Sequence, residues 1–201
     1  MGRRRTIDRE AVLDAAERVV SRAGAARLTL DAVAAEAGIS KASVLYDYKT
    51  KQTLINAVIE RRVAAEDGRI QGFIDELGPA PDAPIRGRIA ATLPSIPDEE
   101  RSVAISLCAA LAQDELLRQP IQKIFRERIE EILRTSEHPR GAMLAFLAVE
   151  GLKLIEWFGL HAWPEPERRR LIAEIAWLVD QRPEPVCGSA DAEKTPANSH
   201  I

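Results

Sequence analysis

Apolar residues recur three and four positions apart along most of the chain, the spacing that places side chains on one face of an α-helix. The first such stripe lies within residues 8–23, ends before Gly24 and consists of Val12, Ala15, Ala16, Val19 and Val20. No segment shows the sustained alternation of apolar and polar residues that marks a half-buried strand. The pattern therefore predicts an all-α protein.

Capping residues and breaks divide the rest of the chain into further helices. Thr29 is placed to cap a second helix that stops at Gly38, Ser40 a third helix to about Tyr46, and Thr50 a fourth and longer one. Segments rich in proline separate the later helices, which we expect at about 84–93, 98–112, 116–136, 139–160 and 165–181.

The segment from Leu28 to Leu54 has the layout of a helix-turn-helix. A tight turn at Gly38 needs a positive φ, which glycine adopts without steric cost. Ala34, one helical turn earlier, leaves room for the next helix to cross closely, and Val44 supplies an apolar contact beyond the turn. In such a unit the second helix lies in the major groove of DNA. The alternative is a plain helical hairpin with a solvated polar face.

The exposed positions of the short third helix suit contacts with bases. Lys41 can donate to guanine, Ser43 to almost any base edge, and Ala42 or Leu45 can pack on a thymine methyl group. Tyr46 shares this face, and Lys49 and Lys51 follow where phosphates are expected. The predicted DNA-binding set is therefore Thr29, Ser40, Lys41, Ala42, Ser43, Leu45, Tyr46, Lys49 and Lys51.

Residues 7–60 resemble the DNA-binding domain of the TetR family of bacterial transcriptional regulators, chiefly in the string LTLDAVAAEAGISKASVLYDYKTKQTL. The resemblance implies a three-helix DNA-binding domain, here 1–52, followed by a larger helical domain for effector binding and dimerisation, here 53–181. It also implies that Thr29 and Lys51 contact phosphates, and that Lys41, Ala42 and Ser43 read bases.

Two positions depart from the family pattern. The family commonly has tyrosine where this chain has Leu45, and histidine where it has Asp47. The first change removes a hydroxyl that would face a phosphate, although Tyr46 lies next to it. The second places an anion in the unfavourable field of DNA. Both changes bear on which operator is bound and how tightly.

The two ends of the chain differ in charge. Residues 1–67 carry a net charge of +2 and the remainder −5, which suggests that the first third meets a polyanion. A basic arm, residues 1–6, could enter the minor groove through its three arginines or remain a solvated end. Residues 182–201 contain three prolines and little apolar surface, so we expect a disordered tail.

Several other classes of protein are disfavoured. There is no apolar run of membrane-spanning length and no secretory signal, and the two cysteines are best read as reduced thiols, so we expect a cytoplasmic protein. The three histidines form no metal motif, and neither a phosphate-binding glycine loop nor a GxSxG motif is present. We therefore expect no cofactor, no metal and no enzymatic activity.

Two late helices are apolar on more than one face, which predicts burial on two sides. One side is the domain's own core, and the other is expected to be a second copy of the chain, because the family dimerises through its last two long helices. The alternative is a helix buried wholly within one monomer. The expected interface residues are Leu147, Gly151, Leu154, Ile155, Phe158, Leu171, Ile175 and Leu178.

The larger domain of this family usually encloses a small-molecule site. We expect a small, largely apolar effector to contact Phe73, Ser106, Phe125, Phe146, Glu150, Lys153 and Trp157, although the apolar members of this set equally suit an ordinary core. Glu150 and Lys153, one turn apart, would either form an ion pair or orient the ligand.

The resemblance implies a homodimeric regulator that binds a palindromic double-stranded DNA operator, usually as a repressor released by its effector. The alternative function is a helical dimeric interaction protein whose DNA-binding head has degenerated, which Leu45 and Asp47 would favour. The two differ in whether one DNA sequence stays preferred as salt rises.

Overall fold

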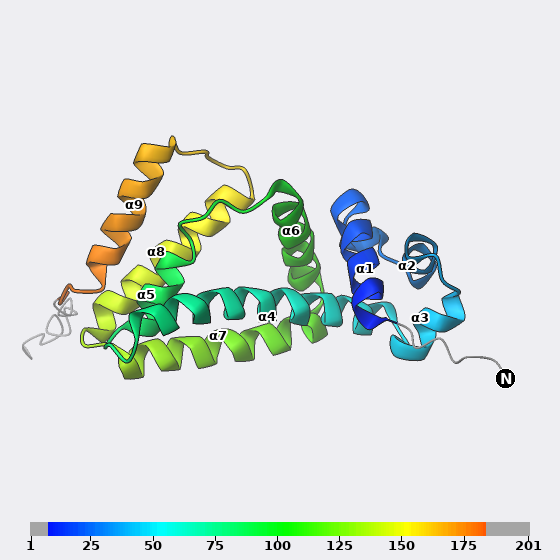
Figure 1. The fold of residues 1–201 in the computed structure, drawn as a ribbon, viewed down its shortest axis with the longest axis horizontal. Helices are drawn as coiled ribbons and strands as arrows, with labels where there is room; N and C mark the ends of the chain where they lie inside the picture. The colour runs from blue at the N-terminus through cyan, green and yellow to red at the C-terminus, as the bar shows by residue number, and fades with distance from the viewer. Residues whose placement is uncertain (1–7, 184–201) are drawn as a thin grey trace, which may run out of the picture.

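The computed structural model describes residues 8–183, and within this range every regular element is helical (Figure 1). The predicted all-α fold class is thus confirmed. The elements are α1 (Arg9–Ala23), the short 3-10 helix η1 (Ala25–Arg27), α2 (Leu30–Ala37), α3 (Lys41–Asp47), α4 (Lys51–Leu77), α5 (Ala83–Ala90), α6 (Asp98–Gln113), α7 (Glu115–Thr135), α8 (Pro139–Trp157) and α9 (Glu165–Leu178).

The helices α1 to α3 form a head at one end of an elongated molecule, and α4 runs from that head into the body beside α7 (Figure 1). The helices α8 and α9 pack on each other at the opposite end. Since α4 is continuous from Lys51 to Leu77, the domain boundary that we predict at residue 52 falls one residue inside this helix. The basic arm and nearly all of the predicted tail lie outside the described residues.

Two groups of buried apolar residues hold the molecule together. The first is the core of the head, built from α1, α2, α3 and the start of α4, and it continues into the body through Val103 and Leu107 of α6 and Leu117 of α7. The second joins α5, α7, α8 and α9 around Phe146. The head is therefore packed on α6 and not merely tethered by α4. None of the helices in residues 8–183 is long and apolar enough to cross a membrane.

The contact between α8 and α9 depends on a glycine. A Cβ atom added to Gly141 would lie 2.4 Å from the carbonyl oxygens of both Leu178 and Gln181. These are backbone atoms at the end of α9, so they cannot move aside as a flexible side chain would. Only the absence of a side chain at residue 141 permits this close packing.

We expect Gly141→Ala to lower the free energy of unfolding by about 1–3 kcal/mol, because the added methyl group forces the two helices apart. Urea denaturation followed by circular dichroism measures the change. The matched control is Gly68→Ala in α4, where an added Cβ meets nothing within 4 Å. There the substitution should leave stability unchanged or raise it by up to about 1 kcal/mol through helix propensity. Equal effects of the two substitutions would contradict the packing argument.

Candidate DNA-binding surface and ligand cleft

Local hydrogen bonds fix the turn between α2 and α3. Thr29 caps α2, with its Oγ1 accepting from the N–H of Ala32 at 3.0 Å. Gly38 ends the helix with φ +65°, in the left-handed region, and the N–H of Ile39 donates to the Ala34 carbonyl at 3.0 Å. These are the interactions that the sequence predicts for a helix-turn-helix, and they set the angle at which α3 leaves the turn.

The short helix α3 has one buried and one open face. Ser40 caps it by accepting from the N–H of Ser43 at 3.1 Å, and the two serine hydroxyls lie 2.9 Å apart. Val44 is fully buried against the head, whereas Ala42, Leu45 and Tyr46 are exposed, Tyr46 by 81%. The fold thus brings the predicted base-reading residues to one open surface, with the Ser43 hydroxyl partly occupied by the cap.

Lys41, which we expect to read bases, and Lys51, which we expect to contact a phosphate, both make contacts within the head. The Nζ of Lys41 lies 2.8 Å from Oδ2 of Asp31 in α2, and both side chains are more than half exposed. The Nζ of Lys51 donates to the Ala26 carbonyl at 2.6 Å and so ties the start of α4 to η1. An ammonium group has three N–H donors, so Lys51 retains two for a phosphate. Lys49 is exposed.

Asp47, which stands where the family commonly has histidine, forms an ion pair that the sequence did not reveal. The Nε and Nη2 of Arg9 each lie 3.0 Å from Oδ1 of Asp47. The Asp47 side chain is only 7% exposed, while that of Arg9 is 70% exposed. The carboxylate at the end of α3 is therefore covered by a guanidinium that faces solvent. Because 38 residues separate the two, no local sequence signal could have revealed the pair.

A second ion-pair group fixes α1 on α2. Glu36 accepts from Arg18 at 2.9 Å and from Arg22 at 2.7 Å. These hydrogen bonds, first that from Arg22 and then that from Arg18, hold the pKa of Glu36 below its usual value. The carboxylate therefore stays ionised and keeps both arginines on the side of α1 that faces α2.

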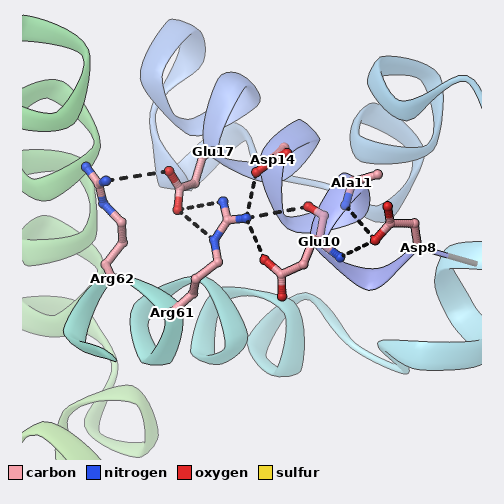
Figure 2. A network of polar contacts seen from close by, with 7 residues as sticks. All are labelled: Asp8, Glu10, Ala11, Asp14, Glu17, Arg61 and Arg62. Atoms are coloured by element: carbon pink, nitrogen blue, oxygen red, sulfur yellow. Dashed lines mark hydrogen bonds and ion pairs between the residues drawn. The ribbon is translucent and has the colours of Figure 1, made fainter. Parts of the chain in front are cut away.

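Ion pairs also connect the head with α4 and α6. Figure 2 shows Arg61 of α4 among three carboxylates of α1, with Nη1 2.7 Å from Asp14 and Nη2 2.7 Å from Glu17. Its neighbour Arg62 lies 3.8 Å from Glu17 and donates to the backbone carbonyl of Glu100 in α6 at 3.2 Å. Three helices of different parts of the chain thus meet at two adjacent arginines.

A cleft of about 260 Å³ opens in the body between α4, α5, α6, α8 and α9 and the loop that joins the last two helices. Of the predicted effector contacts, Lys153 and Trp157 line it. Glu150 lies 3.3 Å from Lys153 and so forms the ion pair considered from the sequence. Phe73, Ser106, Phe125 and Phe146 do not line this cleft. Phe146 is in the core instead, edge-on to Phe125 with ring centroids 6.3 Å apart.

The cleft is far more charged than the sequence led us to expect. Lys153, itself buried, lies 2.6 Å from Glu66 and 5.1 Å from the centroid of the Trp157 ring. Burial raises the pKa of Glu66, but the charge and hydrogen bond of Lys153, together with the charges of Arg128 and Arg88, lower it, and the net shift is downward. Arg168 pairs with Glu156 at 2.7 Å and donates to the carbonyls of Thr92 and Leu93. Sequence periodicity could not identify these buried charges.

One side of α8 presents apolar residues to solvent. Leu147, Leu154 and Phe158 are 60%, 45% and 48% exposed, and Gly151 between them has open space where a side chain would be. Ile155, Leu171 and Leu178 are half-buried, whereas Ile175 belongs to the protomer's own core. Trp177 of α9, which the prediction did not include, is 60% exposed. We call the exposed and half-buried members of this group, which exclude Ile175, the outer apolar face of α8 and α9.

Two models of one protein family match this chain. Residues 12–58 match the model of the bacterial regulatory proteins of the tetR family, and residues 82–180 match a tetracyclin repressor-like C-terminal domain. The chain belongs to the TetR family. The first match spans the helix-turn-helix and the second spans the body, so the resemblance drawn from residues 7–60 is confirmed and extends well beyond them.

Solved structures share the fold of this TetR-family chain at low sequence identity. A protein described as a transcriptional regulator from Pseudomonas aeruginosa PAO1 is 14% identical, with a TM-score of 0.69 over 87% of this chain and 91% of that one. A TetR-family member from Streptomyces coelicolor A3 is 20% identical, with a TM-score of 0.64 over 83% and 96%. The multidrug binding protein EbrR, complexed with ethidium, is 22% identical, with a TM-score of 0.61 over 83% and 96%.

No curated protein has a significantly similar sequence. Membership in the TetR family identifies the protein as a DNA-binding transcriptional regulator. The helix-turn-helix of this family is the part of the head described above, formed by α2, the turn at Gly38 and α3.

Proposed function

We propose that this TetR-family protein is a homodimeric repressor that binds a palindromic operator and leaves it when a small molecule occupies the cleft. The observation that carries the DNA-binding part is the open face of α3. There Lys41, Ala42 and Tyr46 are exposed together while Val44 anchors the helix from behind. The residues that would contact the operator are those predicted from the sequence, with Arg9 added as the partner of Asp47.

The outer apolar face of α8 and α9 supports a dimer. Monomers rarely expose a contiguous apolar face of this kind, and two copies related by a two-fold axis would cover each other's Leu147 and Leu154. Gly151 between them would let the two α8 helices approach closely. A two-fold dimer places its recognition helices in successive major grooves, about 34–36 Å apart.

Contacts of α6 support a route from the cleft to the head. Asp98 and Arg101 of its first turns line the cleft. Glu100 lies between these two residues in the chain, and Ser102 follows them. The Glu100 carbonyl accepts a hydrogen bond from Arg62, and the Ser102 hydroxyl donates one to the Ser21 carbonyl of α1 at 3.1 Å. A ligand that favours a different position of α6 would therefore shift the head relative to the body, and with it the spacing of the two recognition helices. The ethidium complex of EbrR supports a small-molecule site in this fold.

The test is selection of bound fragments from randomised and genomic DNA by the purified full-length protein at near-physiological salt. Recovery of a palindrome supports the dimeric regulator, and a reporter placed behind the recovered site shows whether binding represses. Recovery of no preferred sequence by folded, dimeric protein would contradict the proposal. It would favour a helical interaction protein with a degenerate head, because non-specific contacts alone lose affinity steeply and equally for all sequences as salt rises.

Two lysines of the head should differ in what their removal does. We expect Lys41→Ala to relax base preference at one position in each half-site, at a cost of about 1–3 kcal/mol for the preferred base. Lys51→Ala should weaken binding about equally across sequences and lower the salt dependence by about one counterion per site. Fluorescence anisotropy with operator and scrambled duplexes measures both. Equal and negligible effects would contradict the assigned reading surface.

A further inference from the structure

Arg88 in α5 lines the cleft and has a buried donor without a hydrogen-bond partner among the described residues. The residue is 6% exposed, and its Nη1 is a buried donor with no hydrogen-bond partner in residues 8–183. The carboxylate oxygen Oε1 of Glu150 lies 3.6 Å from it, beyond hydrogen-bond distance. Burial, and next the charge of the neighbouring Arg128, lower the pKa of Arg88. A buried guanidinium without its full set of acceptors destabilises the folded protein, so an acceptor supplied from outside would be bound favourably.

The acidic residues that line the cleft are already engaged. Glu66 lies 2.6 Å from Lys153, Glu156 lies 2.7 Å from Arg168, and Asp98 lies 2.9 Å from Arg101. Glu165 likewise pairs with Arg169 at 3.0 Å. No carboxylate lining the cleft is therefore left over to receive a cationic ligand.

A second arginine that lines the cleft has no carboxylate at hydrogen-bond distance among the described residues. Arg69 of α4 is exposed, lines the cleft and has no carboxylate within 4 Å among the described residues. Together with Arg88 it gives the cleft two guanidinium groups whose charge is not neutralised by a hydrogen-bonded acid. The groups of the cleft that still lack a hydrogen-bonded partner in the described part of the chain are thus positively charged donors.

The walls of the cleft add an apolar and aromatic surface. Trp157 and Trp163 line it, together with Ile70 and Ile96. The Trp157 ring already has the Lys153 ammonium 5.1 Å from its centroid, so its face is engaged by a cation of the protein itself. A cationic ligand would compete with Lys153 for that ring and would be repelled by Arg69 and Arg88. An anionic ligand meets neither obstacle.

We propose that the cleft binds a small organic acid. Its carboxylate accepts a hydrogen bond from Nη1 of Arg88 and faces Arg69, and its hydrocarbon body lies against Trp157 and Trp163. Guanidinium groups hold carboxylates strongly because both partners are charged and their geometries match. This inference rests on the proposed function, since it names the class of effector, and it replaces the largely apolar effector expected from the sequence with an amphipathic anion.

The experiment compares three probes of nearly equal size that differ in charge. These are phenylacetate, phenylacetamide and phenethylamine, titrated into the purified full-length protein. Tryptophan fluorescence reports binding directly because two of the three tryptophans line the cleft. We expect phenylacetate to bind about tenfold or more tighter than phenylacetamide, the effect of one hydrogen bond between charged partners. We expect phenethylamine to bind most weakly.

Substitutions at two arginines of α5 assign the preference to Arg88. Arg88→Met should abolish the preference for phenylacetate over phenylacetamide. Arg88→Lys, which keeps a cation at the site, should retain part of it. The matched control is Arg86→Met, since Arg86 pairs with Asp180 and does not line the cleft. Thermal melts establish that each variant is folded, and the lysine variant keeps the test valid where the methionine variant fails to fold.

Operator binding by the same proteins, without probe, separates this inference from the proposed function. Equal binding of the three probes, preference for the amine, no binding of any probe, or an anion preference that survives both Arg88 substitutions would overturn the organic-acid inference. Each of these outcomes leaves operator recognition untouched. Failure to select an operator overturns the proposed function instead, whatever the probes do.

Discussion

Leu147→Glu is expected to convert the proposed dimer into monomers and to lower operator affinity by about 100-fold or more, since a monomer holds only one half-site. Leu147 is 60% exposed in the protomer, at one end of the stripe that continues through Gly151 and Leu154. In a two-fold dimer a glutamate there would bury an uncompensated carboxylate from each subunit. Sedimentation equilibrium measures the association, and a gel-shift titration with the selected operator measures binding.

The control for this substitution is Leu116→Glu in α7. Leu116 is 68% exposed and lies in the first turn of α7, so the same chemical change is made on a comparable leucine outside the outer apolar face. That variant should remain dimeric and bind the operator normally. Because both leucines are exposed in the protomer, circular dichroism should show both variants folded. Leu147→Glu should melt at a lower temperature than Leu116→Glu, since it loses the stabilisation that association provides. A dimer that survives Leu147→Glu, or one that Leu116→Glu also dissociates, would place the interface elsewhere.

The second large effect is expected at the pair formed by Arg9 and Asp47. Arg9→Gln should lower operator affinity about tenfold, because it removes an exposed cation beside the proposed reading surface and also uncovers a carboxylate at the end of α3. In an Asp47→Asn background the uncovered anion is absent, so the same Arg9 substitution should cost much less. The difference between the two backgrounds is the coupling energy, for which contacting charges give about 0.5–3 kcal/mol. Fluorescence anisotropy with the selected operator provides all four affinities.

A distant ion pair serves as the control for that cycle. Lys123 and Glu127 form an exposed pair on α7 at 3.7 Å, and neutralising either should leave operator affinity unchanged. If Arg9→Gln has the same effect with Asp47 as with Asn at that position, the guanidinium acts on DNA independently of the carboxylate. The coupling should also weaken as salt rises, since Arg9 is 70% exposed.

Several elements of this protein follow from interactions between residues close in sequence. Thr29 and Ser40 each accept a hydrogen bond from an N–H three residues later, and Gly38 adopts the left-handed conformation between them. Such caps and turns are encoded within one helical turn, and so is the apolar face that buries Val44. The head and its exposed face on α3 were predictable for this reason. Three helices end earlier than the sequence predicts, α5 at Ala90, α8 at Trp157 and α9 at Leu178.

The ligand cleft was not predictable in the same way. Its residues come from five helices, and the charges of Arg88 and Arg168 are buried although their residue type favours the surface. Phe146 and Phe125, chosen as pocket residues because they are apolar, pack on each other instead. Periodicity states which face of a helix is buried, but not whether a core, a cleft or another subunit covers it.

The sequence by itself therefore determined the helices, their caps and the helix-turn-helix, because these depend on contacts between residues a few positions apart. The sequence of residues 28–54 also identified the family. Only the tertiary structure decided that Arg9 covers Asp47, and that the buried Nη1 of Arg88 has no hydrogen-bond partner within residues 8–183, in a cleft that two tryptophans also line. The physical reason is that electrostatic compensation acts through space between residues that the fold brings together. The 38 residues between Arg9 and Asp47 carry no local signal of their contact.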